Sequence, residues 1–256
     1  MKKLLITLFA ISLLTSCSGD DNTNISDSDS NSILLKGYSF SNPGEQPLFL
    51  ELSYTGSQIQ SIKSKDLSKR QEYIYNGGQI SNIKTYSNNK LDYEVKIYYN
   101  QSGKIESYFI FSHIGENRIG EEVYRHDISY PSENTFIEKT YHSNTLEYST
   151  IYTLQNGNII EEKQQSSEGY ITYLRYEYDD KIAPKRNIAP REIFQIIRYD
   201  NNGDYNLNNY TKRSLIIKDE IIEEQTFTFT YNSDNYPTTK TMYLNGKVMQ
   251  EYKYSY

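Results

Sequence analysis

The chain repeats one short pattern along most of its length: a strand-like run that closes on an aromatic or leucine residue, a turn rich in Asn, Asp and Gly, and a return run. Three copies span 54–59, 75–80 and 99–105, and in each a tyrosine precedes the turn and an isoleucine follows it. Further copies begin at Leu154, Tyr199, Tyr231 and Leu244. Asn or Asp followed by Gly readily adopts the positive φ angles of tight hairpin turns. The repeating unit is therefore predicted to be a β-hairpin.

The runs between these turns alternate apolar and polar residues. From Leu91 to Tyr99 the odd positions are apolar, and the alternation returns from Thr226 to Tyr231. This period of two is typical of antiparallel strands with one buried and one solvated face. Because short connections pair sequential neighbours, we expect an all-β, up-and-down antiparallel meander of about fifteen strands. Since eight strands already form a barrel that side chains can fill, a sheet of this size should roll into a flattened barrel or roll, or enclose a wide cavity.

The composition agrees with this fold and narrows the function. Tyrosine occurs 27 times and tryptophan not at all, while alanine, the best helix former, stands only at positions 10, 183 and 189. A tyrosine ring can fill the interior of a wide barrel while its hydroxyl group reaches water or a partner. The net charge of −6 repels a phosphate backbone, so no nucleic-acid partner is expected.

One segment departs from the hairpin pattern. Between Asp179 and Arg198 the chain carries two prolines, and Ile193, Ile196 and Ile197 follow at helical spacing. Pro190 suits the first turn of a helix, so one short helix is expected near residues 190–198. Its apolar stripe is interpreted as a plug or cap on the sheet, with a cofactor site as the alternative.

The first residues have the organisation of a secretory leader. Lys2 and Lys3 precede an apolar run from Leu4 to Leu14, which is too short for a membrane-spanning helix. The following Leu-Thr-Ser-Cys17 resembles the lipobox of bacterial lipoproteins, which implies cleavage after residue 16 and lipidation of Cys17. Two or three acyl chains would provide a stable membrane anchor. The alternative is an ordinary signal peptide that contains a cysteine.

Residues 17–32 form a polar, acidic stretch that we interpret as a disordered tether ahead of a single all-β domain, residues 33–256. The Ser-Gly-Asp-Asp sequence at 18–21 resembles the export signal of Bacteroidetes surface lipoproteins. That resemblance implies an outer-membrane protein that faces the cell exterior. A generic linker, with the domain held in the periplasm, remains the alternative.

The hairpins also resemble known repeats, most closely at Tyr199–Gly203, which is similar to the YD repeats of Rhs-type proteins. With the lipobox and the segment from Asp234 to Tyr254, the chain over about residues 45–256 resembles Bacteroidetes lipoproteins of unknown function with a porin-like fold. The resemblance implies architecture and location but no activity. Between Arg118 and Tyr130, charges on both strand faces argue against a membrane-spanning barrel.

Motifs for catalysis are missing from the sequence, so no catalytic residue is assigned. Adjacent carboxylates point to opposite faces of a strand and are interpreted as solvated charges, with a cross-strand carboxylate pair as the alternative. They occur at Glu121–Glu122, Glu161–Glu162, Asp179–Asp180 and Glu223–Glu224.

A metal site is not expected either. His113, His126 and His142 fall at unrelated spacings on different strands, which indicates structural or surface roles. Oxygen side chains alternate from Asp200 to Asn208, but Gly and Glu are missing from the positions that an EF-hand requires. We interpret this stretch as a polar turn, with a weak calcium site as the alternative.

These observations favour a lipid-anchored binding or scaffolding module that is not an enzyme, needs no cofactor or metal, and is expected to be a monomer. Its partners would be the membrane, through Cys17, and a glycan or an envelope protein. Tyr98, Tyr199 and Asp200 are the candidate binding residues, because aromatic side chains are enriched at contact surfaces. The alternatives are a surface glycan hydrolase and a structural accessory of an envelope complex.

Overall fold

The computed structural model describes residues 33–113, 121–197 and 204–256, and Ile33–Tyr256 form one unit. These described residues form sixteen strands and one helix. In chain order they are β1 (Gly37–Ser41), β2 (Leu48–Thr55), β3 (Gln58–Ser64), β4 (Lys69–Asn76), β5 (Gln79–Ser87), β6 (Lys90–Tyr99), β7 (Ile105–Ser112), β8 (Glu121–Ser132), β9 (Thr135–His142), β10 (Thr145–Gln155), β11 (Asn158–Ser166), β12 (Ile171–Ile182), α1 (Arg191–Ile196), β13 (Asn208–Ile217), β14 (Glu220–Tyr231), β15 (Pro237–Leu244) and β16 (Lys247–Ser255).

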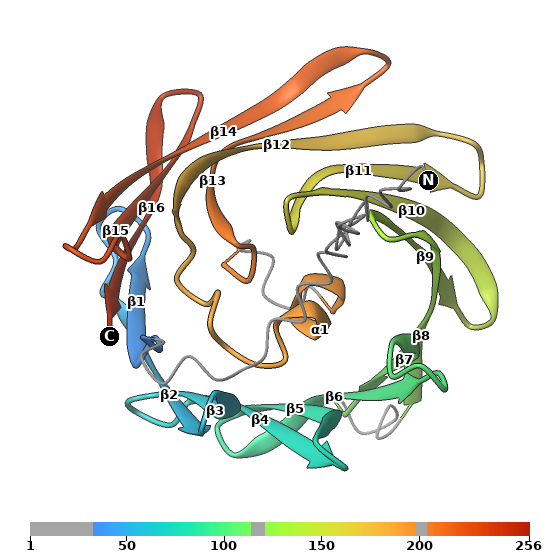
Figure 1. Ribbon diagram of the computed structural model, residues 1–256, viewed down its shortest axis with the longest axis horizontal. Helices are drawn as coiled ribbons and strands as arrows, with labels where there is room; N and C mark the ends of the chain where they lie inside the picture. Colours follow the sequence, from blue (N-terminus) through green and yellow to red (C-terminus); the bar gives the residue numbers. More distant parts are fainter. Residues whose placement is uncertain (1–32, 114–120, 198–203) are drawn as a thin grey trace, which may run out of the picture. The chain divides into compact units, whose positions relative to one another are not determined.

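The strands form a closed barrel in which each strand pairs with its neighbours in sequence (Figure 1). The ring closes where β1 pairs antiparallel with β16, which places Gly37 opposite Ser255. The prediction of an all-β, up-and-down meander is confirmed, with sixteen strands in place of about fifteen. A closed ring leaves no continuous edge strand, which removes the usual template for edge-to-edge aggregation.

Tight turns join many of the strands, as the repeated pattern indicated. The central residues of the turn before β14, Lys218 and Asp219, have φ angles of 51° and 64°. Asn88 and Asn89, between β5 and β6, have φ angles of 49° and 62°. Two consecutive positive φ angles define the type I′ turn, whose twist matches that of paired strands. Asn and Asp tolerate this conformation better than most residues, which explains their recurrence.

The period of two separates the inner and outer faces of the barrel. In β6, Val95 and Ile97 are buried in the main hydrophobic core, whereas Tyr98 between Ile97 and Tyr99 is exposed. The same core includes Phe227 of β14. Apolar residues at every second position therefore fill the interior, as predicted.

A ladder of tyrosine hydroxyl groups links successive hairpins and explains why tyrosine precedes so many turns. In each bond, a tyrosine near the end of the first strand of a hairpin donates to a main-chain carbonyl oxygen. This oxygen lies near the start of the second strand of the preceding hairpin or, for Tyr54, near the start of β1. These bonds are Tyr54 to Leu35 (2.7 Å), Tyr75 to Ile59 (2.8 Å), Tyr99 to Ile80 (2.7 Å), Tyr130 to Ile105 (3.0 Å) and Tyr178 to Ile159 (2.5 Å). Within one hairpin, the tyrosine and the isoleucine of the repeat flank the turn. Between neighbouring hairpins, the tyrosine of one repeat also contacts the isoleucine of another.

Helix α1 lies within the ring of strands (Figure 1). Ile193, Ile196 and Ile197 are buried in the same core as the strand residues. Phe194 packs edge-on against Tyr73 of β4, with ring centroids 5.5 Å apart. The predicted helix near 190–198 and its role as a plug are therefore confirmed. Among the described residues, no helix combines the length and the apolar character of a membrane span.

Buried charges hold the segment between β12 and β13 inside the barrel. Lys185 is fully buried, and its Nζ lies 3.8 Å from Asp204 Oδ2. Lys240 of β15 is also buried and reaches Asp204 Oδ1 at 3.2 Å. Aromatic rings surround both ammonium groups, including Tyr205 at 4.7 Å from Lys185 and Tyr252 at 4.5 Å from Lys240. This cluster ties the inserted segment to the barrel wall.

Candidate functional site

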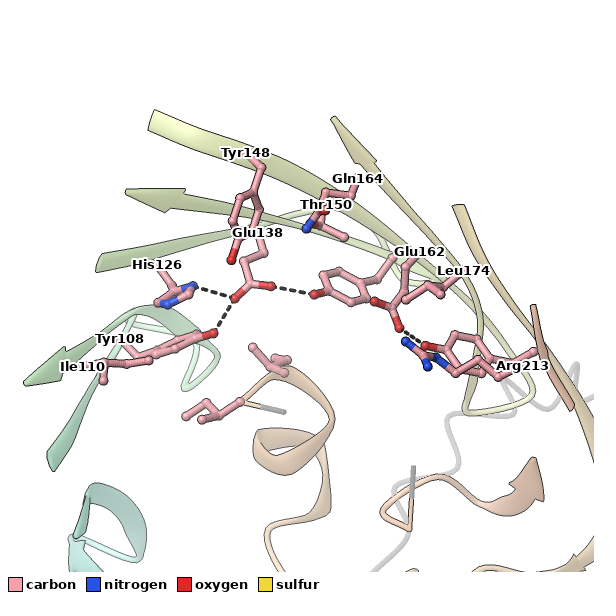
Figure 2. A pocket seen from close by; sticks show the side chains of 14 residues that line it. Tyr108, Ile110, His126, Glu138, Tyr148, Thr150, Glu162, Gln164, Leu174 and Arg213 are labelled. Carbon is pink, nitrogen blue, oxygen red and sulfur yellow. Dashed lines mark hydrogen bonds and ion pairs between the residues drawn. The ribbon is translucent and has the colours of Figure 1, made fainter. Parts of the chain in front are cut away.

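A cavity of about 460 Å³ lies on the inner face of the barrel (Figure 2). Strands β7 to β13 provide most of its wall, and Ile196 and Ile197 at the end of α1 line it as well. Its volume is within the range of natural ligand sites. The other lining residues are Tyr108, Ile110, His126, Glu138, Tyr148, Thr150, Tyr152, Glu162, Gln164, Leu174, Tyr176 and Arg213.

Glu138 of β9 contacts three polar side chains of this cavity. Its carboxylate accepts hydrogen bonds from the hydroxyl groups of Tyr108 and Tyr152, the latter at 2.6 Å. His126 Nδ1 lies 2.9 Å from the same carboxylate (Figure 2). The three partners come from β7, β10 and β8, so the barrel register brings them together.

These contacts keep Glu138 ionised although it is buried. Burial alone would raise the pKa of this carboxyl group, but the hydrogen bond and charge of His126, together with the two tyrosine hydroxyl groups, lower it below 4.5. Burial and the charge of Glu138 raise the pKa of Tyr108 well above 10, so its hydroxyl remains a donor. The cavity therefore holds a fixed negative charge that can accept hydrogen bonds.

His126 is held rigidly beside this carboxylate. Its ring stacks on Tyr108 with centroids 4.2 Å apart and an angle of 7° between the planes. Thr140 Oγ1 also lies 3.1 Å from Nδ1. In contrast, Nε2 is buried and has no hydrogen-bond partner among the described residues.

A second carboxylate, Glu162 of β11, lines the same cavity. It is 8% exposed and accepts a hydrogen bond from the hydroxyl group of Tyr176. Figure 2 shows Arg213 beside this pair. The cavity thus contains two glutamates on alternate strands of the wall, and each accepts a hydrogen bond from at least one tyrosine hydroxyl group.

The structure corrects the interpretation of one carboxylate doublet. Glu161 points outward and pairs with Arg175 at 2.7 Å, but Glu162 points inward and is buried. The expectation of a solvated charge is therefore wrong for Glu162, because the alternation of a strand puts one of two neighbours inside. The expectation that neighbours face opposite sides is confirmed.

Sequence reasoning did not single out Glu138 or Arg213. Both line the cavity from inward positions of their strands. Glu138 alternates with buried Phe136 and Thr140. In the sequence, such a residue appears as a charge at a position where the alternation of the strand predicts a buried side chain. This pattern is ambiguous, because a β-bulge or an error of one residue in the alternation exchanges the inner and outer faces of the strand.

Of the predicted binding residues, the structure describes only Tyr98. Tyr98 is 50% exposed on the outer face of β6 and packs edge-on against Phe109, with centroids 5.4 Å apart. It is separate from the cavity. Tyr199, Asp200 and Cys17 lie outside the described residues, as do the leader and the tether.

The described part of the alternating polar stretch has structural partners. Asn206 Oδ1 accepts hydrogen bonds from the main chain of Ile159 and from Gln195 Nε2. Asn208 Oδ1 accepts from Asn158, and Asp204 pairs with the two buried lysines. Within the described residues, no group of three or more His, Cys, Asp or Glu side chains is arranged to hold a metal ion.

Comparison with known proteins gives a likeness in structure only. No family model and no curated protein matches the sequence. A porin-like protein from Bacteroides vulgatus ATCC 8482 aligns with a TM-score of 0.55 and 15% identity, over 88% of this chain and 99% of that chain. A porin-like protein from Bacteroides uniformis ATCC 8492 aligns with a TM-score of 0.38 and 13% identity, over 86% of this chain and 83% of that chain. The first comparison shows a shared fold and nothing about the ligand.

Proposed function

We propose that the barrel is a binding module for a small, hydroxyl-rich ligand, with a short glycan as the leading class. The observation that supports this is the pairing of two buried glutamates with tyrosine hydroxyl groups in one cavity of about 460 Å³. Charged acceptors form strong hydrogen bonds with hydroxyl groups. The surrounding tyrosine and isoleucine side chains supply the apolar contact that ligand sites also need.

Hydrolysis of a glycan is the second candidate, because two carboxylates in one cavity are what a glycosidase requires. A general acid must carry a proton near the working pH. The pKa of Glu138 is lowered, so this residue suits an acceptor and not a proton donor. In a hydrolase Glu138 would therefore be the nucleophile or base and Glu162 the acid. We propose binding as the function, with hydrolysis as the alternative.

The binding proposal can be tested with the purified full-length protein and a panel of neutral, acidic and amino-sugar oligosaccharides. Saturation-transfer NMR would identify the bound class, and calorimetry would measure the dissociation constant. We expect Glu138→Gln and Glu162→Gln each to weaken binding about tenfold or more, because each removes a charged acceptor. Glu161→Gln is the matched control on the outer face and should bind like the wild type.

The same samples distinguish the two candidates. A binding module leaves the oligosaccharides intact, whereas a hydrolase releases new reducing ends and loses this activity in one of the cavity variants. If no oligosaccharide binds at millimolar concentration, the glycan proposal fails.

We further propose that the protein is attached to the outer membrane by lipid on Cys17 and faces the cell exterior. The lipobox-like residues and the acidic stretch after them support this proposal. Metabolic labelling with a fatty acid should mark the wild type and not Cys17→Ala. External protease should digest the protein on intact cells, and protection of the lipidated protein would place it in the periplasm.

A further inference from the structure

The cavity that holds Glu138 and Glu162 also contains two polar side chains that the protein itself does not engage. Thr150 of β10 and Gln164 of β11 line this cavity, and neither side chain has a hydrogen bond among the described residues. The protein does not enclose their polar atoms, so both remain accessible from the cavity. Polar groups of this kind are available to a ligand.

The register of the barrel places these two side chains next to each other and between the glutamates. Thr150 lies opposite Glu138 of β9 on one side and opposite Gln164 on the other. Glu162 stands two residues before Gln164 on β11, so both point into the barrel. Figure 2 shows Thr150 and Gln164 close together on the wall between the two glutamates. A ligand that lies across β9, β10 and β11 would therefore contact both side chains.

The chemistry of this pair differs from that of the glutamates. An ionised carboxylate only accepts hydrogen bonds, whereas the carboxamide of Gln164 and the hydroxyl group of Thr150 both donate and accept. A secondary amide presents its N–H and its C=O in opposite directions, because the group is planar and trans. Two neighbouring side chains that each donate and accept can bind the two ends of such an amide at once.

Apolar side chains border the polar pair. Leu174 of β12 lies opposite Glu162 and lines the same cavity. Ile196 and Ile197, at the end of α1, line it as well. These three side chains provide a surface on which a methyl group is removed from water, which is favourable. The cavity thus offers partners for an amide together with contact for a small apolar group.

We propose that the cavity binds a 2-acetamido sugar and that Gln164 and Thr150 select its acetamido group. This inference rests on the proposed glycan-binding function and names the substituent that is recognised. Gln164 Oε1 accepts from the amide N–H, the Thr150 hydroxyl group donates to the amide C=O, and Leu174 contacts the methyl group. A hydroxyl group at the same sugar carbon brings no methyl group. A protonated amine cannot accept a hydrogen bond from Thr150.

The test uses the full-length protein and two matched sets of methyl glycosides, one in the glucose and one in the galactose configuration. Within each set the sugars differ only at carbon 2, which carries an acetamido, a hydroxyl or an amino group. In at least one set, calorimetry should show the acetamido sugar binding about tenfold or more tightly than the other two, because of its extra hydrogen bonds and methyl contact. Gln164→Leu should abolish this preference and leave binding of the hydroxyl sugar unchanged.

A second variant and a control complete the test. Thr150→Val conserves the shape of the side chain and should reduce the preference about threefold or more. Gln165→Leu alters the exposed neighbour of Gln164 on the outer face of β11 and should keep the full preference.

Equal binding of the acetamido and hydroxyl sugars, tighter binding of the amino sugar, or an undiminished preference in both the Gln164 and the Thr150 variant would overturn this inference and leave the glycan proposal standing. Absence of binding by all six sugars at millimolar concentration would also overturn it. The glycan proposal itself fails only if the oligosaccharide panel does not bind either.

Discussion

Lys240 Nζ lies 3.2 Å from Asp204 Oδ1, and both side chains are almost completely buried. The same aspartate faces Lys185 through its other oxygen. Lys240 belongs to β15, whereas Asp204 lies just before β13, so the contact joins the inserted segment to the wall. Buried charges are tolerated only when they are compensated.

Replacing Asp204 with asparagine should therefore destabilise the fold. We expect Asp204→Asn to lower the free energy of unfolding by about 3–5 kcal/mol, because two buried ammonium groups lose the carboxylate that they share. The exposed pair of Arg175 and Glu161 provides the control. Arg175→Met should cost at most about 1 kcal/mol in the same urea titration. Equal losses would contradict the structural role of the buried cluster.

The tyrosine ladder should contribute measurably at each step. Tyr75→Phe removes the hydroxyl group that donates to the carbonyl of Ile59. We expect a loss of about 0.5–1.5 kcal/mol in the free energy of unfolding. Tyr98→Phe, at an exposed tyrosine without a side-chain hydrogen bond among the described residues, should leave stability unchanged. A neutral Tyr75→Phe variant would show that the ladder is incidental.

The buried tyrosines should make the protein sensitive to alkali. Burial raises the pKa of Tyr75 and of Tyr130 to about 12, against 10 in the unfolded chain. The folded state therefore retains protons that the unfolded state loses, so this contribution is complete below pH 10 and is lost as pH rises through about 12. We expect tyrosinate absorbance and loss of near-ultraviolet dichroism to change together. Complete titration of all tyrosines with the fold intact would contradict this.

Glu138 should act in the opposite direction at low pH. Its pKa is lowered in the folded protein from 4.5, so its contribution to stability is present above pH 4.5 and disappears as pH falls through the folded value. Glu138→Gln should be less stable than the wild type by roughly 1–3 kcal/mol at neutral pH. The difference should shrink in acid. A difference that does not depend on pH would show that the charge of Glu138 is unimportant.

Two glycines in Asn-Gly turns should respond differently to the same substitution. Gly157 and Gly246 have φ angles of 73° and 75°. A Cβ atom at Gly157 would lie 2.5 Å from Leu207 Cδ1, whereas none of the neighbouring atoms lies within 4 Å at Gly246. Gly246→Ala should cost about 1–2 kcal/mol through backbone strain alone. Gly157→Ala should cost roughly 1–3 kcal/mol more, and equal losses in thermal unfolding would contradict the close packing of the inserted segment.

The fold was largely predictable because its determinants are local. Each Asn-Gly or Asn-Asn turn indicates a hairpin, and each alternating run such as 91–99 indicates which side is buried. The apolar stripe of Ile193, Ile196 and Ile197 likewise predicted a buried helix. Closure of the ring was only one of the expected forms, because the pairing of Gly37 with Ser255 depends on strand tilt and stagger.

The cavity was not predictable for a related reason. Glu138, His126 and Tyr108 meet only through the register of β7, β8 and β9, and bulges shift that register at several hairpins. Glu162 was interpreted, with its neighbour Glu161, as a solvated charge. Tyr98 was predicted as a binding residue because it shares a strand face with polar residues. The tyrosines of the cavity, in contrast, occupy the same alternating positions as ordinary core residues.

The seam between β1 and β16 has a kinetic consequence. Every other strand pair joins neighbours in sequence, so the sheet can grow by successive local steps, whereas the seam joins residues 218 positions apart. Closing a flexible loop of that length costs about 5 kcal/mol of chain entropy, which should make this step late and slow. Because the two ends meet on adjacent strands, the sheet behaves as a ring cut open at one place. Joining the ends with a short linker and cutting a polar turn such as Asn88–Asn89 would conserve every strand pair while moving the slow step.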